Sequence, residues 1–462
     1  MQALVRMAYR AAVADYTAAR RTRDLNSAFA ALERAHVLGQ RYLVAHIATH
    51  IRMFRIGLAR RDFREMAGQI LRLIATIPGY LTGWVPKGNT GGANVSAIKP
   101  MSLDPEVEPL LHDFRVWRDV TWRAALYASV VLAGFLALAV IESRRTNAAA
   151  VLDATWERRT VARLEPLPST AFLEVLPVVN FHAAPGLKSE PGVSYLIRTD
   201  RHTVLFDLGF NRAQESPSPL EHNLAALDVS LNAIDAVFIS HAHRDHVGGT
   251  AFERALSFSF GIEQKPLPAT LKVLTPVSMR YPGKEVQTAS EPATWLPAMA
   301  TTGPIPRQLV LGRIDEQALV IHVAGRGLVA IVGCGHQTIP KLVAHIRATF
   351  QEPLIGIVGD LHYPVPKGRL FIAGIDAQRR LASGKGLWET MEFDQATAEL
   401  AVLQRELQFL VLGSHDTSDE VHQHAEHTWG PRFQRAMAGK PLCIENQAGS
   451  ALRPGRCRPS AG

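Results

Sequence analysis

Residues 236–249 read AVFISHAHRDHVGG, and this stretch decides how the rest of the chain is interpreted. Its first residues are apolar β-formers, and three histidines and an aspartate then follow within six residues. On an extended or turning backbone, His241 and His243 can face the same way, while Asp245 and His246 reach a second point nearby. Imidazole suits several transition metals, and a carboxylate adds hard-oxygen character. The stretch therefore predicts a buried strand that ends in a metal-binding loop, in preference to a solvated His-rich turn.

Four further apolar segments of the C-terminal half also lead into residues that bind metals. VLFDLG contains Asp207, VAIVGCGH ends in Cys334 and His336, IGIVGDLH ends in Asp360 and His362, and FLVLGSHD ends in His415 and Asp416. Strands that share a sheet end at a common edge, where ligands commonly bind in a cleft. The recurrence predicts one cleft that collects these side chains, because packing alone explains it poorly.

Metallo-β-lactamase-fold hydrolases carry the pattern H-x-H-x-D-H after a buried strand, and the loop that begins at His241 is similar to it position by position. The order GVSYLI, LFDLG, ISHAHRDHVGG, TGPIPR, DEQALVI, GLVAIVGCGHQTI and VGDLH resembles more narrowly the branch that contains the 7,8-dihydropterin-6-yl-methyl-4-(beta-D-ribofuranosyl)aminobenzene 5'-phosphate synthases. The resemblance runs from about Phe172 to Ser450. It implies an α/β fold, the αββα sandwich, in which two mixed sheets are covered by helices on the outside.

The resemblance also implies a centre of two divalent metal ions, most often zinc, with iron or manganese as alternatives. The first two histidines of the loop would hold one ion, and its aspartate and last histidine the other. The full set of implied metal ligands is His241, His243, Asp245, His246, His336, Asp360, His362 and His415. Asp207 would brace the metal loop from behind, and Cys334 is interpreted as a small buried residue beside the ions. Asp245 or Asp360 could carry a proton to the leaving group.

Two departures from the family pattern bear on this site. Family members usually carry a histidine between the metal loop and the next hairpin, but between Gly249 and Cys334 this chain has only His322, inside a predicted strand. Either His336 takes that place or the first ion lacks a ligand. The family's closing His-Cys-Thr-Gly reads HDTS here, so His415 is retained and the pocket beside it is expected to differ.

Two neighbouring metal ions can share a hydroxide that attacks an ester, lactone, thioester or phosphodiester. No G-x-S-x-G pattern points to a serine nucleophile instead. The sequence therefore predicts a metal-dependent hydrolase of a small molecule. A non-catalytic metal-containing sensor or ligand-binding protein is the first alternative, and a nucleic-acid-processing nuclease is the second. The nuclease is disfavoured because the net charge of +8 lies wholly in residues 1–123, where 18 Lys and Arg stand against 10 Asp and Glu.

Residues 124–141, AALYASVVLAGFLALAVI, are 18 uncharged and mostly apolar residues. That length is close to what a bilayer requires, and Trp122, Arg123 and Arg144 flank the segment as interface anchors. We therefore expect a single transmembrane helix rather than a buried core helix. A basic front domain is hard to translocate, so the metal domain is expected on the periplasmic side. If the helix does not span a membrane, the protein is expected to be cytoplasmic.

The rest of the chain is organised around these two features. The expected parts are a small helical domain at residues 1–115, the membrane helix with its flanks at 116–145, a linker at 146–168 and the metallo-β-lactamase-fold domain at 169–455. The segment from Leu32 to Met101 resembles a small helical bacterial family without a known function. The three cysteines are too few and too widely spaced for a disulfide framework or a four-cysteine zinc site.

Three histidines of the N-terminal domain form a second candidate for metal binding. His46 and His50 are one helical turn apart, with His36 nearby, and such a pair can share a metal ion. Because no Asp or Glu lies close to the pair in sequence, packed or solvated histidines are the preferred interpretation. The Gly-, Pro- and Asn-rich residues 79–101 are expected to form a loop.

Overall fold

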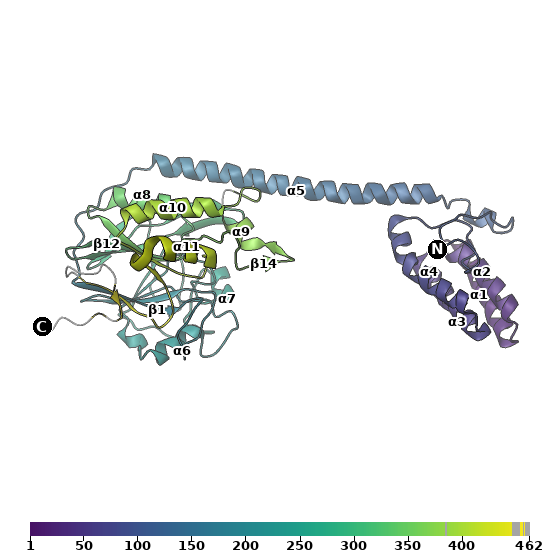
Figure 1. The fold of residues 1–462 in the computed structure, drawn as a ribbon, viewed down its shortest axis with the longest axis horizontal. Coiled ribbons are helices and arrows are strands. Elements are labelled where there is room, and N and C mark those ends of the chain that lie inside the picture. The colour runs from purple at the N-terminus through teal and green to yellow at the C-terminus, as the bar shows by residue number, and fades with distance from the viewer. Residues whose placement is uncertain (384–385, 446–452, 456, 458–462) are drawn as a thin grey trace. The chain divides into compact units, whose positions relative to one another are not determined.

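The structure is a computed structural model that describes residues 1–383, 386–445, 453–455 and 457. Its chain divides into two compact units, Met1–Ala139 and Val140–Gly462. The boundary between the units falls inside one long helix, α5 (Val116–Arg158), as Figure 1 shows.

The first unit is a bundle of short helices, as the sequence predicts. Its helices are α1 (Ala3–Arg21), α2 (Leu25–Gly39), α3 (Leu43–Arg60) and α4 (Phe63–Thr82), with the short helix η1 (Glu108–Leu111) farther along the chain. The Asp24 side chain accepts hydrogen bonds from the backbone N–H groups of Asn26 and Ser27, so it caps α2. Asp62 caps α4 in the same way, because its side chain accepts the backbone N–H of Glu65.

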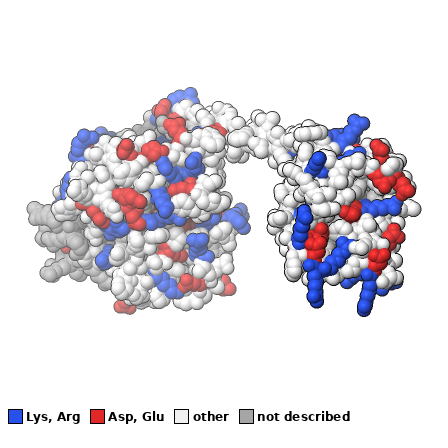
Figure 2. All heavy atoms as spheres, turned by 45° about the vertical axis from the view of Figure 1, so that its right-hand side comes forward, with Lys and Arg blue, Asp and Glu red and all other residues white. Residues whose placement is uncertain are grey.

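Helix α5 contains the apolar segment that the sequence marks as a membrane helix. An 18-residue window of it has a mean hydropathy of 2.4, and none of that window is buried inside the structure. The helix is therefore long and apolar enough to cross a membrane. In Figure 2 the chain that links the two units shows almost no charged side chains, in agreement with this window. The helix continues to Arg158, into the expected linker, because NAAAVLDATWER is rich in good helix formers.

The second unit contains two large sheets. The first sheet has the order β19 (Arg453–Pro454), β18 (Leu442–Glu445), β1 (Phe172–Val179), β2 (Ser194–Arg198), β3 (Thr203–Phe206), β4 (Ala236–Phe238), β5 (Lys272–Thr275) and β6 (Gln287–Thr288). The second has the order β17 (Phe433–Arg435), β16 (Phe409–Leu412), β13 (Leu354–Gly359), β12 (Gly327–Val332), β11 (Leu319–Val323), β8 (Met299–Thr301) and β7 (Ala293–Leu296). Two hairpins lie outside them, β9 (Ile305–Leu309) with β10 (Gly312–Glu316), and β14 (Phe371–Ile372) with β15 (Ile375–Asp376).

Helices cover the outer faces of both sheets (Figure 1). The helices of this unit that follow α5 are α6 (Pro219–Ala226), η2 (Leu231–Ala233), α7 (Thr250–Arg254), α8 (Ile339–Thr349), α9 (Ala377–Ala382), α10 (Phe393–Glu406), α11 (Asp419–Trp429) and η3 (Gly430–Arg432). One apolar core lies between the sheets and includes Phe206 from the first and Phe409 from the second. A second core packs α8, α10 and α11 on one sheet, and a third packs α6 on the other. The predicted αββα sandwich is thus confirmed.

The strand directions explain why polar residues gather at one edge. β3, β4 and β5 run parallel to one another in the first sheet, and β12, β13, β16 and β17 run parallel in the second. The loops that follow these strands in each sheet therefore leave from the same edge.

A disulfide joins Cys443 of β18 to Cys457, with Cα atoms 5.1 Å apart. The spacing of the cysteines predicts no disulfide framework and does not reveal this single bridge. It forms because β19 turns back antiparallel to β18 and returns the chain to Cys443. Cys334 is the free cysteine, and it is buried.

The centre of the second sheet offers a test of this packing. Gly356 pairs with Phe409 of the neighbouring strand, and a Cβ atom built on Gly356 would lie 2.2 Å from the Phe409 ring. We expect Gly356→Ala to lower the free energy of unfolding by about 1–3 kcal/mol, because the extra methyl group overpacks the core. Thermal unfolding followed by circular dichroism measures the change. Gly134→Ala is the matched control, since nothing lies within 4 Å of the Cβ position there. An unchanged unfolding midpoint for Gly356→Ala would contradict this packing.

Candidate metal centre

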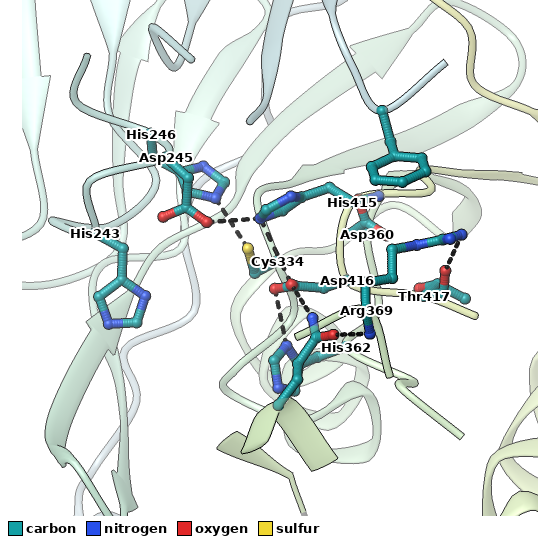
Figure 3. A network of polar contacts seen from close by, with 12 residues as sticks. His243, Asp245, His246, Cys334, Asp360, His362, Arg369, His415, Asp416 and Thr417 are labelled. Carbon is teal, nitrogen blue, oxygen red and sulfur yellow. Dashed lines mark hydrogen bonds and ion pairs between the residues drawn. The ribbon is translucent and has the colours of Figure 1, made fainter. Parts of the chain in front are cut away.

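The loops after five strands bring their polar side chains together between the two sheets. They are the loops after β3, β4, β12, β13 and β16, which carry Asp207, then His241 to His246, then Cys334 and His336, then Asp360 and His362, then His415 and Asp416. Figure 3 shows Asp245, His246, Cys334 and His415 pointing toward one another. Residues far apart in sequence therefore form one buried cluster, at the edge that the strand endings predict.

Asp207 holds the loop after β4 from behind. Its fully buried carboxylate accepts hydrogen bonds from the Ser240 backbone N–H (2.7 Å) and the Ser240 hydroxyl (2.6 Å). The same carboxylate lies 2.6 Å from Nδ1 of His246. Since a carboxylate oxygen accepts, His246 Nδ1 carries a proton, and its Nε2 faces Sγ of Cys334 at a hydrogen-bond distance of 2.9 Å. Asp207 therefore sets both the position and the tautomer of His246.

The first group of candidate ligands combines imidazoles with the Cys334 thiol. His241 Nε2 and His243 Nδ1 are 3.1 Å apart, and the His336 ring lies 5.0 Å from each of their rings. Candidate ligand atoms of His241, Cys334 and His336 all lie within 4.8 Å of one another. Burial is the main cause that lowers the pKa of His241, His243 and His336, so the rings are neutral and can donate lone pairs.

The second group combines a carboxylate with imidazoles. Candidate ligand atoms of Asp245, His246, Cys334 and His415 lie within 4.8 Å of one another, and His415 Nε2 is 2.6 Å from Asp245 Oδ2. Burial alone would lower the pKa of His415, but the carboxylates of Asp416 and Asp245 outweigh it and raise the pKa to about 10. The negative potential at this point favours a cation, whether a proton or a metal ion. Because Cys334 belongs to both groups, the two groups are adjacent.

A third group joins His336 to His362 and Asp416. His362 Nδ1 lies 3.0 Å from Asp416 Oδ2, and Gln378 donates to Asp416 Oδ1 at 2.6 Å. The sequence places Asp416 at the end of a strand, but Asp416 is not among the ligands predicted from it. The sequence feature that could have identified Asp416 is its position next to His415 in HDTS, the motif that departs from the family pattern.

Asp360 lies outside these three groups. It is fully buried, and its Oδ2 accepts the backbone N–H of His415 at 3.1 Å. Its Oδ1 has no hydrogen-bond partner among the described residues. Burial raises the pKa of Asp360 to about 6. The side chain thus supports the loop that carries His415, and one oxygen remains available.

Glu316 supports the loop after β12, although it is not among the site residues predicted from the sequence. Its buried carboxylate accepts the backbone N–H groups of Cys334 (3.0 Å), Gly335 (3.0 Å) and His336 (2.7 Å). Gly335 has φ +83°, and a Cβ atom there would lie 2.8 Å from Leu361 Cα, so the turn requires glycine. The signal was the acidic pair in the DEQALVI motif, directly before an apolar strand.

The donor atoms of the cluster fit divalent transition metals. His336 Nδ1, His362 Nε2 and His415 Nδ1 are buried and have no hydrogen-bond partner in the described part of the chain. A set of imidazole nitrogens, carboxylate oxygens and one thiol matches the ligands of zinc and of iron. His322, the histidine between the metal loop and Cys334, is instead held in β11 with Nδ1 2.6 Å from the Leu167 carbonyl oxygen.

Comparison with known proteins agrees with this architecture. The model of the metallo-beta-lactamase superfamily matches residues 188–394, which include the loop after β4 and the Cys334–His336 turn but end before His415. The model of a protein family of unknown function, DUF3703, matches residues 3–111. The N-terminal resemblance predicted from sequence is thereby confirmed.

Individual relatives are distant. The 7,8-dihydropterin-6-methyl-4-(beta-D-ribofuranosyl)-aminobenzene-5'-phosphate synthase of Methanocaldococcus jannaschii is 21% identical, with 43% of this chain and 79% of that protein covered. A solved metal-dependent hydrolase of the beta-lactamase superfamily is 18% identical, with a TM-score of 0.40 and coverage of 59% of this chain and 99% of that chain. The metallo-beta-lactamase fold protein YhfI of Bacillus subtilis is 13% identical, with a TM-score of 0.36 and coverage of 59% and 98%. The family match identifies a domain of the metallo-beta-lactamase superfamily at residues 188–394, and members of this superfamily are mostly hydrolases.

Proposed function

We propose that this protein is a membrane-tethered, metal-dependent hydrolase of a small molecule. The observation that carries the proposal is the buried convergence of imidazole, carboxylate and thiol groups from five strand-end loops. Structural packing alone does not account for buried ring nitrogens that lack partners among the described residues.

In this proposal two divalent cations, most often zinc, occupy adjacent positions. His241, His243 and His336 would hold the first ion. His336 would then replace the histidine that family members carry between the metal loop and the next hairpin. Asp245, His246 and His415 hold the second. Cys334 belongs to both groups of candidate ligands, and His362 and Asp416 form a further group with His336. The ligands of this proposal are His241, His243, Asp245, His246, His336 and His415.

The residues of this site have separate roles in the proposed reaction. When bound, divalent cations would lower the pKa of a water molecule and stabilise developing negative charge on the substrate. Asp245 is engaged by His415, so we assign proton transfer to Asp360. A pKa of about 6 suits a general base near neutral pH, and Asp360 Oδ1 has no partner in the described chain.

A cavity of about 220 Å³ adjoins the cluster and supports a small substrate. Its wall includes Arg307, Gly335, His362, Tyr363, Glu389 and Glu399. Burial lowers the pKa of Arg307 only to about 10, so this side chain is charged at neutral pH. The small volume of this cavity favours an ester, lactone or phosphodiester of a small molecule over a nucleic acid chain.

We also propose that α5 spans a membrane, with the metal domain on the periplasmic side. The apolar window has no buried residue, whereas the core helix of a globular domain would be mostly buried. The disulfide between Cys443 and Cys457 belongs to the same unit as the metal cluster. Disulfides persist in oxidising compartments, which the periplasm provides.

Removing a ligand tests the metal centre. We expect His243→Ala to lose bound metal and to lower kcat/KM by more than the ~100-fold that outer residues of metal sites can cost. Metal analysis by mass spectrometry and an assay over a panel of esters, lactones and phosphodiesters measure the two effects. The exposed His427 provides the control variant His427→Ala. Chelators and acid should also remove the metal, since protons compete for the same nitrogens. Full activity of His243→Ala without metal would refute the proposal.

The tautomer set by Asp207 is open to a separate test. In Asp207→Asn, the amide N–H can donate to His246 Nδ1 and move the ring proton to Nε2, where a metal ion would bind. We expect metal affinity to fall by about 10–100-fold while the fold persists. Titration with zinc and a competing chelator measures the affinity. Asp235→Asn is the control, because Asp235 is exposed and accepts the backbone N–H of Thr203. If Asp207→Asn and Asp235→Asn bind zinc with equal affinity, Asp207 does not position His246 for metal binding.

The membrane helix can be tested by charge insertion. We expect the double variant Leu132→Arg and Leu136→Arg to leave the membrane fraction, since each arginine near the centre of a span costs about 2.5–3.5 kcal/mol. Cell fractionation with carbonate washing measures the distribution. Ala148→Arg with Val151→Arg is the control on the same helix beyond the apolar window. A wild-type chain found in the soluble fraction would exclude the span.

A further inference from the structure

Three buried histidines converge inside the first unit, remote in sequence from the cluster described above. His36 lies in α2, and His46 and His50 lie in α3. Their Nε2 atoms are 2.9 Å apart for His36 and His46, 3.0 Å for His46 and His50, and 3.3 Å for His36 and His50. All three Nε2 atoms thus face one point, and the sequence had left His36 outside the helical pair.

The outer nitrogens of two of these rings have fixed roles. His36 Nδ1 lies 2.7 Å from the Asn89 carbonyl oxygen, which can only accept, so this nitrogen carries the proton. His50 Nδ1 lies 2.6 Å from Oε1 of Gln69. The Gln69 amide is oriented by its NH₂ group, which donates to Glu65 Oε1 and to the Gly91 carbonyl oxygen. His50 Nδ1 therefore also carries a proton.

The inner nitrogens of His36 and His50 are consequently bare lone pairs in the neutral rings. Burial lowers the pKa of all three histidines, to about 3 for His46 and about 4 for His50, so none is charged at neutral pH. If His46 Nε2 carries a proton, it can donate a good hydrogen bond to His36 Nε2 or to His50 Nε2, but not to both. The lone pair of the other ring would then have no donor. One cation at the common point would satisfy all three nitrogens.

The distances suit a small metal ion. Tetrahedral zinc with Zn–N bonds of about 2.0–2.1 Å separates its ligand nitrogens by about 3.3 Å, and the three observed separations approach that value. An ion at that bond length would lie roughly 1 Å out of the plane of the three nitrogens, which leaves its fourth position open.

The surrounding chain is built to hold the three rings. Gly91 has φ +82°, and a Cβ atom there would lie 2.6 Å from the His36 ring, so the loop can pack on the ring only with glycine. Arg72 donates to the carbonyl oxygens of Gly92 and Val95 and fixes the same loop on α4. Glu65 accepts the Ala93 N–H at 2.9 Å and the Gln69 amide. The expected loop of residues 79–101 begins only after α4 ends at Thr82, and the Gly-rich residues 83–101 close over the histidines.

A cavity of about 370 Å³ opens beside the three rings. Its wall is mostly apolar and includes Ala75, Pro78, Trp84, Val85, Pro86 and Ile98. The three-histidine arrangement therefore has an approach for an external ligand from one side.

We propose that His36, His46 and His50 bind one divalent first-row transition metal ion, of the class of Zn²⁺, in the N-terminal unit. Its fourth position faces the apolar cavity and takes water or a small exogenous ligand. This site is separate from the metal centre of the metallo-beta-lactamase domain, and it stands whether or not that centre is catalytic.

Metal counting in the full-length protein tests this site. We expect His46→Gln and His50→Gln each to lose one equivalent of tightly bound zinc per chain relative to wild type. His112→Gln, which changes an exposed histidine of the same unit, should lose none. Combining His46→Gln with His243→Ala should remove zinc additively, because the two sites are independent. If folded His46→Gln and His50→Gln retain the wild-type zinc content, the proposal is overturned.

A second measurement does not depend on the variants folding. Crystals of the wild-type protein grown with zinc should give an anomalous scattering peak at the zinc edge within bonding distance of the three Nε2 atoms. If crystals grown in excess zinc show no such peak, the proposed N-terminal site is overturned. A peak there without one at the metallo-beta-lactamase cluster would support this site and count against the proposed hydrolase instead.

Discussion

The candidate metal centre depends on the hydrogen bonds that the buried carboxylate of Asp207 accepts. Removing an ionised carboxylate from water is costly unless hydrogen bonds replace its hydration. Asp207 receives them from the backbone and hydroxyl of Ser240 and from His246 Nδ1, so its charge is held between two parallel strands. The bonds join the end of β3 to the loop after β4, and they turn Nε2 of His246 toward Cys334.

A second carboxylate serves the opposite sheet. Glu316 collects three successive backbone N–H groups and thereby shapes the turn that presents Cys334 and His336. One brace therefore belongs to each side of the sandwich, and the donor atoms meet between them. Neither brace lies in the histidine motif, although the motif has its geometry only because both are present.

The two histidine clusters of this chain differ in the chemistry they can support. The cluster in the metallo-beta-lactamase domain mixes imidazoles with the carboxylates of Asp245 and Asp416, which raise the pKa of His415 and favour positive charge. Among the described residues, the candidate ligands of the cluster in the first unit are imidazoles alone. The carboxylate of Glu65 lies behind them and accepts a hydrogen bond from Gln69. The first arrangement suits charge stabilisation during hydrolysis, whereas the second suits the retention of a single ion.

The sequence by itself determined the αββα sandwich, the helical front domain, the apolar helix and the loop of His241 to His246, because these depend on local hydrophobic period and on contiguous motifs. It also predicted that strand-end residues would meet, since parallel strands share an edge. Only the tertiary structure decided that Asp416 joins His362, that Glu316 holds the Cys334 turn, and that Cys443 reaches Cys457. It likewise brought His36 of one helix to His46 and His50 of another. The physical reason is that these contacts depend on how separate elements pack and how side-chain amides orient, and no local period of the sequence encodes either.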